Sequence, residues 1–376
     1  EAQLGSTDLN LVTPDATTLT IKQGHSSATD FHTITAAKAT TMNLGGTDAD
    51  SAGTQYDGGL EATTVDAGEL VTLNIDSNQG ARTINTLTAA KLTTLNIVGD
   101  NAVSVGANGA TTTLLATVDA STSSGGVTIA GNVDLTSTAN VTLGTAADTL
   151  TLDILTESNV VVNAGEHATT DAGVNDTLLL AGANNQGLTV VDLSSTTDQV
   201  TQINGAVNTA AITNFENITL SGLTGSQTAS ITGSDEANVI IATANADTIV
   251  AGKGADTITM GDGIDTVLGE AGDDRFMVTA ATDILGTTHV EDTITGGDGT
   301  ADALVFDTTG GAITIANTAD FGTVTEVEAV AMIPSANALS LTVKADFVAD
   351  TGITVIDLSG DTNTTGTNVV SLAALS

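Results

Sequence analysis

The sequence predicts an all-β protein, a β-solenoid or parallel β-roll in which short strands and turns repeat coil after coil. Short runs rich in Val, Ile, Leu and Thr recur along the chain, and Gly, Asn, Asp or Ser separates them. Apolar residues at helical spacing are scarce. One segment, Thr35–Leu44, returns in closely similar form as Thr88–Ile97, and such repetition indicates stacked units. A string of β-sandwiches is the alternative, but sandwich strands are usually longer than these.

The composition narrows the classes of function. Of 376 residues, 45 are acidic and seven are basic, so the formal charge is −38. Nucleic acids and anionic membranes are bound through clustered Lys and Arg, so we expect neither as a partner. No apolar run approaches the roughly 20 residues of a membrane span, so we expect no membrane insertion. The chain has no Cys, so something other than disulfides or thiolate-bound metal must stabilise its coils.

The chain divides into three regions by the character of its sequence. Residues 1–220 form an irregular β-repeat region, in which Thr and Asn inside the strands can build polar ladders between coils. Residues 221–305 contain a regular array, and residues 306–376 form a C-terminal β region. Two further segments, Ile212–Leu220 and Val324–Met332, share their apolar positions and a central Glu. This second pair again favours stacked coils.

From Gly233 to Met277 the sequence divides into five units of nine residues without a gap. The sixth position of each unit is Asn or Asp, the eighth is a large apolar residue, and Gly recurs at the second and fourth. Because Gly adopts backbone conformations closed to other residues, such turns can direct carbonyl oxygens toward a common point. We predict a six-residue turn and a three-residue strand in each unit. The sixth positions are Asn238, Asp247, Asp256, Asp265 and Asp274, and the glycines are Gly252, Gly254, Gly261, Gly263 and Gly272.

This array resembles the RTX family of calcium-binding, secreted repeat proteins, whose nonapeptide is Gly-Gly-x-Gly-x-Asp-x-U-x, with U a large apolar residue. The resemblance implies a parallel β-roll with two units per coil, so that turns two units apart stack and hold Ca²⁺ between them. One column would contain Asn238, Asp256 and Asp274, and the other Asp247 and Asp265. Ca²⁺ prefers the hard oxygens that Asp carboxylates and main-chain carbonyls supply. We therefore expect calcium as the cofactor, with roughly three ions in the stacked turns.

The array departs from the family pattern at both ends. Its first two units lack Gly at the second and fourth positions, and Asn238 is neutral, so we expect weak binding there. The segment Gly296–Asp302 resembles a further unit with one inserted residue, which adds Asp298 and Asp302 as candidate ligands. The segment Leu143–Thr151 resembles an isolated, degenerate unit.

The sequence gives no support for catalysis. It contains no His-Glu-x-x-His zinc motif, no Gly-x-Ser-x-Gly nucleophile elbow and no phosphate-binding loop. A β-helix enzyme that acts on anionic sugars would need cationic groups against the developing charge. The chain has only seven Lys and Arg, and two of them, Lys253 and Arg275, lie inside the array. We therefore expect that the chain is not an enzyme.

The wider chain resembles bacterial surface-layer proteins of the RTX type. The likeness rests on short strands rich in Thr, Ala, Gly and Asn, on the absence of Cys, on the acidity, and on nonapeptides embedded within the repeat architecture. It implies type I secretion, an extracellular location on the cell surface, and calcium-dependent self-assembly into a lattice, with a cell-surface glycan or lipopolysaccharide as a further partner. Two alternatives remain open: an adhesin or extracellular-matrix filament subunit, and a non-catalytic RTX portion of a larger secreted hydrolase.

Overall fold

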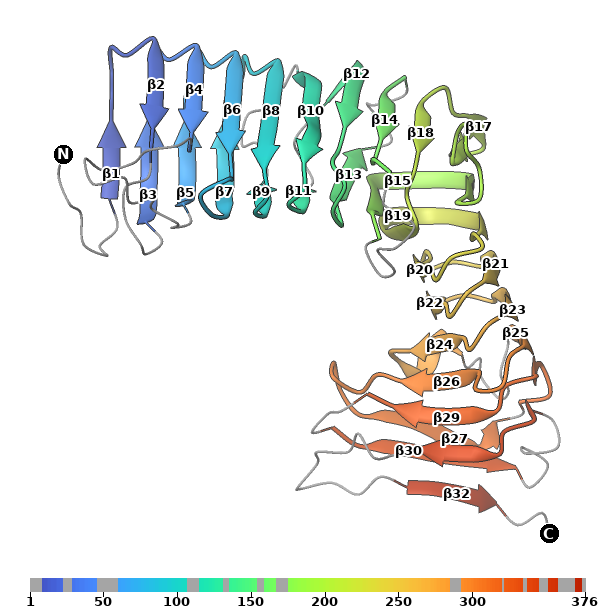
Figure 1. Ribbon diagram of the computed structural model, residues 1–376. Coiled ribbons are helices and arrows are strands. Elements are labelled where there is room, and N and C mark those ends of the chain that lie inside the picture. Colours follow the sequence, from blue (N-terminus) through green and yellow to red (C-terminus); the bar gives the residue numbers. More distant parts are fainter. Residues whose placement is uncertain are drawn as a thin grey trace. The chain divides into compact units, whose positions relative to one another are not determined.

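The fold is nearly all-β, as the sequence predicts, and the chain packs into two compact units (Figure 1). In the described residues the computed structural model contains no helix long and apolar enough to cross a membrane. Unit 1 comprises residues 1–181, 196–198 and 208–215, and unit 2 comprises residues 182–195, 199–207 and 216–376. The structure describes residues 9–22, 29–45, 60–106, 115–130, 135–153, 159–166, 175–284, 292–319, 321–333, 337–344, 351–357 and 369–373.

Unit 1 is a solenoid with two parallel sheets, and successive coils give one strand to each sheet. One sheet contains β2 (Thr18–Ile21), β4 (Thr41–Leu44), β6 (Thr72–Asp76), β8 (Thr94–Gly99), β10 (Leu115–Ser123), β12 (Leu135–Thr142), β14 (Val161–Asn163) and β18 (Ala211–Thr213). The other contains β1 (Leu9–Val12), β3 (Thr29–Thr35), β5 (Leu60–Asp66), β7 (Arg82–Thr88), β9 (Val103–Val105), β11 (Val127–Ile129), β13 (Thr149–Asp153) and the start of β15 (Thr177–Asp192).

The strands of unit 1 alternate between a buried and an outward side chain, so in-register stacking produces apolar columns inside the solenoid. Met42, Leu73 and Leu95 are direct partners in β4, β6 and β8, and all three are fully buried. The strands β4 and β8, which belong to the repeated segments, lie two coils apart with β6 between them.

Outward Asn side chains on the same strands form the predicted polar ladder. The Nδ2 atom of Asn74 donates to Oδ1 of Asn43 at 2.7 Å, and Nδ2 of Asn96 donates to Oδ1 of Asn74 at 2.8 Å. The ladder also extends back to β2, where Oγ1 of Thr20 accepts from Nδ2 of Asn43 at 3.0 Å. Identical amides at the same position of successive coils therefore satisfy one another.

Unit 2 contains the nonapeptide array, and its parallel strands stack in two rows. The first row is β19 (Asn217–Thr232), β20 (Val239–Ile241), β22 (Thr257–Thr259), β24 (Arg275–Val278), β26 (Ala303–Phe306), β29 (Ala329–Met332) and β31 (Val355–Asp357). The second row is β19, β21 (Thr248–Lys253), β23 (Thr266–Ala271), β25 (Thr293–Asp298) and β28 (Val324–Thr325). Other elements are the hairpin β16 (Val200–Ile203) and β17 (Ala206–Val207), the short 3-10 helix η1 (Ala281–Asp283), and the sheet of β27 (Ile313–Ala319), β30 (Leu339–Lys344) and β32 (Val369–Ala373).

Strand partners in the array are two nonapeptides apart, as a β-roll with two units per coil requires. Ile240 pairs with Ile258 on one side, and Ile249 pairs with Val267 on the other. The apolar eighth positions thus separate into two buried columns, and apolar residues before and after the array extend both. One is Ile218, Ile240, Ile258, Phe276, Leu304 and Val330, and the other is Ile231, Ile249, Val267, Ile294 and Val324. The division of the chain into regions 1–220, 221–305 and 306–376 stays a prediction.

Candidate metal centre

The sixth positions of the units stack into two columns of buried polar side chains, one along each row of strands. In the first column each carboxylate accepts a hydrogen bond from the main chain of the coil before it. Asp256 Oδ1 accepts from the N–H of Asn238 at 2.7 Å, and Asp274 Oδ1 accepts from the N–H of Asp256 at 2.9 Å. Asp302 Oδ1 accepts from the N–H of Asp274 at 2.7 Å. The structure therefore brings Asn238, Asp256 and Asp274 together as the array predicts, and adds Asp302.

The second column repeats this bonding. Asp247 Oδ1 accepts from the N–H of Ala229, and Asp265 Oδ1 accepts from the N–H of Asp247 at 2.7 Å. Asp292 Oδ1 then accepts from the N–H of Asp265 at 2.8 Å. All these Asp side chains are buried.

In four of these carboxylates the second oxygen, Oδ2, accepts no hydrogen bond from the described part of the chain. Oδ2 of Asp256, Asp265, Asp274 and Asp302 is buried and has no hydrogen-bond donor in the described part of the chain. A buried acceptor without a donor is costly, and a buried anion without a countercharge is more so. Each of these four carboxylates therefore requires a proton or a cation.

The pKa values of these four carboxyl groups are raised, because their burial disfavours the charged form. Burial, followed by repulsion from neighbouring carboxylates, raises the pKa of Asp256 to about 7 and that of Asp265 to about 8. Burial also raises the pKa of Asp274, and raises that of Asp302 to about 6. Main-chain hydrogen bonds oppose the rise without cancelling it. A bound divalent cation would reverse this balance and hold the carboxylates ionised.

The glycine turns bring main-chain oxygens close to the carboxylates. All five candidate glycines have φ between +87° and +146°, where other residues are strained. A Cβ atom on Gly272 would lie 1.5 Å from the carbonyl oxygen of Gly254 in the coil before, so these turns stack too closely for a side chain. A Cβ on Gly269 would lie 2.3 Å from both Oδ2 of Asp274 and the carbonyl oxygen of Gly296. The partnerless carboxylate oxygen and a carbonyl oxygen thus face the same point.

This donor set fits Ca²⁺. No group of three or more His, Cys, Asp or Glu side chains converges within the described residues, so main-chain oxygens must supply many of the ligands. Ca²⁺ takes six to eight oxygens at about 2.3–2.6 Å, main-chain carbonyls included, and it tolerates irregular geometry. In the bound state Asp256, Asp265 and Asp274 would supply the charge, and the stacked Gly turns would supply carbonyl oxygens. The ion would supply the countercharge that the buried carboxylates need.

The first two units satisfy their sixth positions without an ion. Oδ1 of Asn238 accepts from the N–H of Ser234 at 2.7 Å, and its Nδ2 donates to the carbonyl oxygen of Glu216 at 2.7 Å. Oδ2 of Asp247 accepts from both the N–H and the hydroxyl of Thr243 at 2.8 Å. Ser and Thr at the second position therefore occupy the oxygens that an ion would use. This geometry supports weak calcium binding at this end, which stays a prediction.

The structure also revises the list of candidate residues. Asp298 is exposed and lies outside both columns, and its main-chain oxygen accepts from the N–H of Gly272 at 3.2 Å. Our sequence reasoning missed Asp292, although the phrase Asp292-Thr-Ile repeats the sixth to eighth positions of the array. It also missed Glu328, whose Oε2 accepts from the N–H of Asp302 at 3.0 Å and so extends the first column.

The degenerate segment in unit 1 resembles the first two units of the array. Asp148 is buried, and its Oδ1 accepts from the N–H of Val127 at 2.6 Å. Its Oδ2 accepts from the N–H of Gly144 at 2.8 Å. Oδ1 of Asp176 then accepts from the N–H of Asp148 at 2.7 Å. Main-chain donors thus satisfy Asp148 with no cation.

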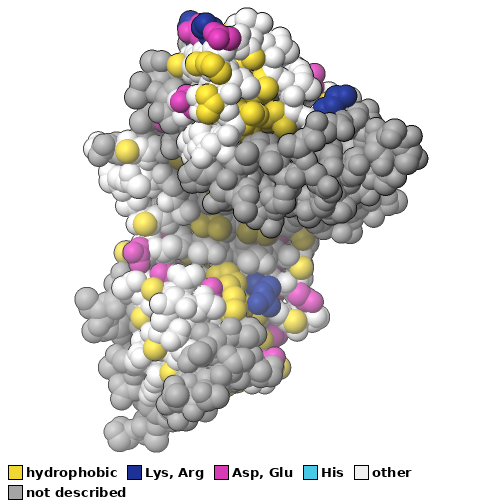
Figure 2. Space-filling model, turned by 90° about the vertical axis from the view of Figure 1, so that its left-hand side faces the viewer, with side chains coloured by type: hydrophobic (Ala, Val, Ile, Leu, Met, Phe, Trp, Pro, Cys, Tyr) yellow, Lys and Arg dark blue, Asp and Glu magenta, His cyan; other side chains and the backbone are white. Residues whose placement is uncertain are grey.

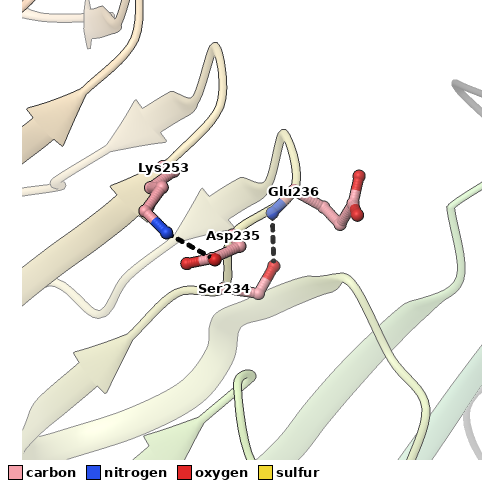
Figure 3. Close-up of polar contacts among 4 residues, drawn as sticks. All are labelled: Ser234, Asp235, Glu236 and Lys253. Carbon is pink, nitrogen blue, oxygen red and sulfur yellow. Dashed lines mark hydrogen bonds and ion pairs between the residues drawn. The ribbon is translucent and has the colours of Figure 1, made fainter.

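Exposed charges add little to the site. Nζ of Lys253 lies 2.6 Å from Oδ2 of Asp235 in the coil before, and Figure 3 shows this pair beside the turn in which the N–H of Glu236 donates to Oγ of Ser234. Both charged side chains are mostly exposed, and exposed pairs of this kind contribute little to stability.

Stacked glycine turns, buried Asp columns and two nine-residue units per coil define a calcium-binding parallel β-roll. Residues 232–267 and 261–285 match the family model of the RTX calcium-binding nonapeptide repeat. RTX nonapeptide repeats bind calcium, and calcium is therefore the ion of this segment. No curated protein and no solved structure was found to match the chain. RTX repeat proteins are typically secreted, which accords with an extracellular location.

Proposed function

We propose that this chain is a structural protein of the cell surface, exported by type I secretion, which folds and self-assembles with calcium into a surface layer. The observation that carries this proposal is the set of buried, partnerless carboxylate oxygens at Asp256, Asp265 and Asp274. Their demand for a cation makes the folding of unit 2 depend on calcium.

Calcium gating follows from the same carboxylates. Inside a cell free Ca²⁺ is scarce, so the stacked carboxylates repel one another and the Gly-rich turns gain too little burial to become ordered. Unit 2 can then stay unfolded until it is exported. Outside, Ca²⁺ neutralises the columns and folds the roll.

Self-assembly is the second part of the proposal. A net charge of −38 keeps separate copies apart, and Ca²⁺ that bridges carboxylates of two copies would relieve this repulsion. A lattice could attach to the cell through a surface glycan or lipopolysaccharide. On the face drawn in Figure 2, the Lys and Arg side chains of the described residues are few and do not gather into a patch. This supports the proposal that neither nucleic acid nor an anionic membrane is a partner.

We also propose that the chain is not an enzyme. The buried carboxylates of the columns have a structural use in every coil, since each bonds the coil before it. Among the described residues this leaves them no free role as an acid and base pair.

The test is a calcium titration of the purified chain, followed by circular dichroism and light scattering, with magnesium as the control ion. Strand content and particle size should rise together between micromolar and millimolar Ca²⁺ and should reverse with chelator. A planar array in electron micrographs supports a surface layer, whereas a fibre indicates the filament alternative. Activity that appears only in a longer chain indicates the hydrolase alternative. A chain that stays folded and monomeric without Ca²⁺ overturns the proposal.

A matched pair of variants separates calcium binding from general acidity. Asp256→Asn removes a buried column carboxylate, and Asp235→Asn removes an exposed one from the same part of the roll. We expect the first to shift the calcium midpoint at least tenfold upward and the second to leave it unchanged. Equal shifts in both would mean that bulk charge, and not the column, drives the response.

A further inference from the structure

Four successive coils of unit 1 link its two sheets through the same five-residue turn. Main-chain hydrogen bonds stack each turn on the next. The N–H of Val71 donates to the carbonyl oxygen of Thr40 at 2.9 Å, and the N–H of Thr93 donates to that of Val71 at 3.0 Å. Equal positions of the four turns therefore lie in register. The turns are Thr13–Thr17, Ala36–Thr40, Ala67–Val71 and Ala89–Thr93.

The middle residue of each turn is charged, and the sign alternates from coil to coil. Nζ of Lys38 forms an ion pair with Asp15, and Nζ of Lys91 forms one with Glu69. Each of the four side chains is at least 50% exposed. Two acidic and two basic groups cancel, although the whole chain has a formal charge of −38. We call Asp15, Lys38, Glu69 and Lys91 the charge stripe.

The surface on one side of the charge stripe is uncharged. Three residues after each charge, an outward Thr starts the next strand, and Figure 1 shows these strands side by side. The Asn ladder, which is also neutral, follows along the same strands. The opposite side of the stripe carries the exposed Asp66, so we place the contact on the Thr side. This Thr row is Thr18, Thr41, Thr72 and Thr94 in β2, β4, β6 and β8.

The order of signs makes the charge stripe complementary to itself. A second copy, related by a two-fold axis parallel to the strands, presents the stripe in reverse order. Asp15 then faces Lys91 of the second copy, and Lys38 faces Glu69 of the second copy. Every charge meets its opposite over a length of about 14 Å, which is three strand spacings of about 4.8 Å. A two-fold contact requires such self-complementarity, and two-fold dimers are the commonest homo-oligomers.

The stripe selects an orientation more than it supplies affinity. Exposed ion pairs are individually weak, but like charges brought face to face oppose every other alignment of the two copies. The net negative charge of the chain repels a second copy, and a stripe without net charge avoids this repulsion locally. In the two-fold alignment the Thr rows of two copies can pack face to face, as identical in-register side chains do between paired sheets.

We propose that the charge stripe and the Thr row form a two-fold contact between two copies of this chain, and that this contact needs no calcium. The inference rests on the proposed self-assembly and names one of its interfaces. All of its residues lie in unit 1, whereas the calcium columns lie in unit 2. Calcium folds unit 2, and the stripe joins copies in pairs.

The test exchanges the two charges within one ion pair at a time. The first variant carries Asp15→Lys with Lys38→Asp, and the second carries Glu69→Lys with Lys91→Glu. Each exchange keeps the composition, the net charge and an ion pair between the same two coils. It also makes the order of signs identical in both directions, so that like charges meet in the two-fold contact. Neither variant alone should form the dimer.

Sedimentation velocity in excess chelator measures the association at about 0.15 M salt, where a Debye length of about 8 Å screens most of the bulk charge. The wild type should dimerise, and each variant alone should have a dissociation constant at least tenfold higher. An equimolar mixture of the two variants should restore the dimer, because their stripes are complementary. All four substitutions together restore the alternation and should also restore the dimer.

A wild type that is monomeric in chelator, or variants that dimerise as well as the wild type, overturn the proposal. A mixture that stays monomeric, although both variants keep the strand content of the wild type, overturns it as well. Because calcium is absent, these outcomes are independent of the calcium titration that tests the proposed function.

Zero-length carbodiimide cross-linking of the wild type needs no variant. Within one chain Asp15 and Lys91 lie three coils apart, about 14 Å, which is too far for a direct amide bond. In a mixture of isotope-labelled and unlabelled chains, a link between Asp15 and Lys91 should therefore join one labelled and one unlabelled peptide. Links of Lys91 to Glu69 of the same chain, with none to Asp15, would contradict the two-fold contact.

Discussion

Glu270 occupies the second position of its unit, where the two units before it have Gly252 and Gly261. Its φ of +72° lies in the left-handed region, as do those of the two glycines. A residue with a Cβ pays roughly 1–2 kcal/mol for that conformation. Glu270 therefore adopts the turn conformation of the neighbouring units, and its backbone is strained as a result.

Replacing Glu270 with Gly should stabilise the calcium-bound protein. The gain should be up to about 1 kcal/mol, since relief of strain is partly offset by the greater freedom of Gly in the unfolded chain. Thermal unfolding in saturating calcium measures it. Glu236→Gly is the control: Glu236 is also exposed but has no left-handed φ, so that change should be neutral or destabilising. A lower melting temperature for Glu270→Gly would refute the strain argument.

The buried carboxylates predict opposite pH dependences with and without calcium. In the metal-free fold the pKa values of Asp256, Asp265 and Asp302 are raised to about 7, 8 and 6, above their unfolded value of about 4. Between about pH 4 and pH 8 the folded, metal-free chain therefore binds more protons than the unfolded chain. The contribution of these three groups to the stability of the metal-free fold is greatest below about pH 4 and is lost as pH rises toward 8.

The measurement is thermal unfolding of unit 2 at pH 5.5 and pH 8, with chelator and with calcium. With chelator, unit 2 should keep its strands and a melting transition at pH 5.5 and should lack both at pH 8. With saturating calcium the order should invert, because protons displace the ion. The same order in both conditions would mean that these carboxylates neither bind calcium nor titrate as their burial requires.

At the scale of the strand, sequence reasoning succeeded where the period is constant. The nine-residue spacing predicts the turns and the repeating apolar position, and the RTX resemblance adds the two units per coil that stack Asp256 on Asp274. It missed Asp292 because this residue stacks on Asp265 across 27 residues, whereas the column partners inside the array are 18 apart. The coils of unit 1 vary in length, since Thr41 pairs with a residue 31 positions on, and the next pair is 22 apart. No fixed period could therefore give the register there.

The Asn ladder of unit 1 tests how much side-chain stacking contributes to a strand. Asn74 donates to Asn43 and accepts from Asn96, so Asn74→Ala removes two hydrogen bonds at once. We expect a loss of about 1–3 kcal/mol in the free energy of unfolding, measured by urea titration. Asn85→Ala, which removes a single exposed bond to Glu61, should cost under about 1 kcal/mol. Equal losses would show that the ladder adds nothing beyond isolated hydrogen bonds.

At the scale of the whole molecule, the two units differ in how they balance buried charge. Unit 2 has carboxylate oxygens without donors in its described part, whereas unit 1 supplies its own cation at one turn. Arg82 is almost fully buried, and it donates to the carbonyl oxygens of Asp76 and Ala81 at 3.0 and 3.2 Å. Its guanidinium thus lies among main-chain oxygens, as a metal ion would, but is covalently attached to the chain.

Chelation should therefore separate the two units. With excess chelator at pH 8, we expect unit 1 to stay folded and unit 2 to lose its strands. Limited proteolysis should then leave a resistant fragment that ends near residues 181–215, and calcium should restore protection of the full chain. Arg82→Met should make unit 1 less stable with or without calcium. Complete digestion with chelator would show that the units share one calcium-dependent transition.

The hydrogen bonds from main-chain N–H groups to carboxylates in the two columns all point the same way, and their direction sets the order in which the turns can close. The N–H of each sixth position donates to a carboxylate 18 residues later in the array, so a turn is finished only when its successor is in place. A ribosome or a narrow channel that releases the chain amino end first delivers every turn before the residue that completes it. The turns therefore close in the order in which the chain appears, each one coil behind the residue that completes it.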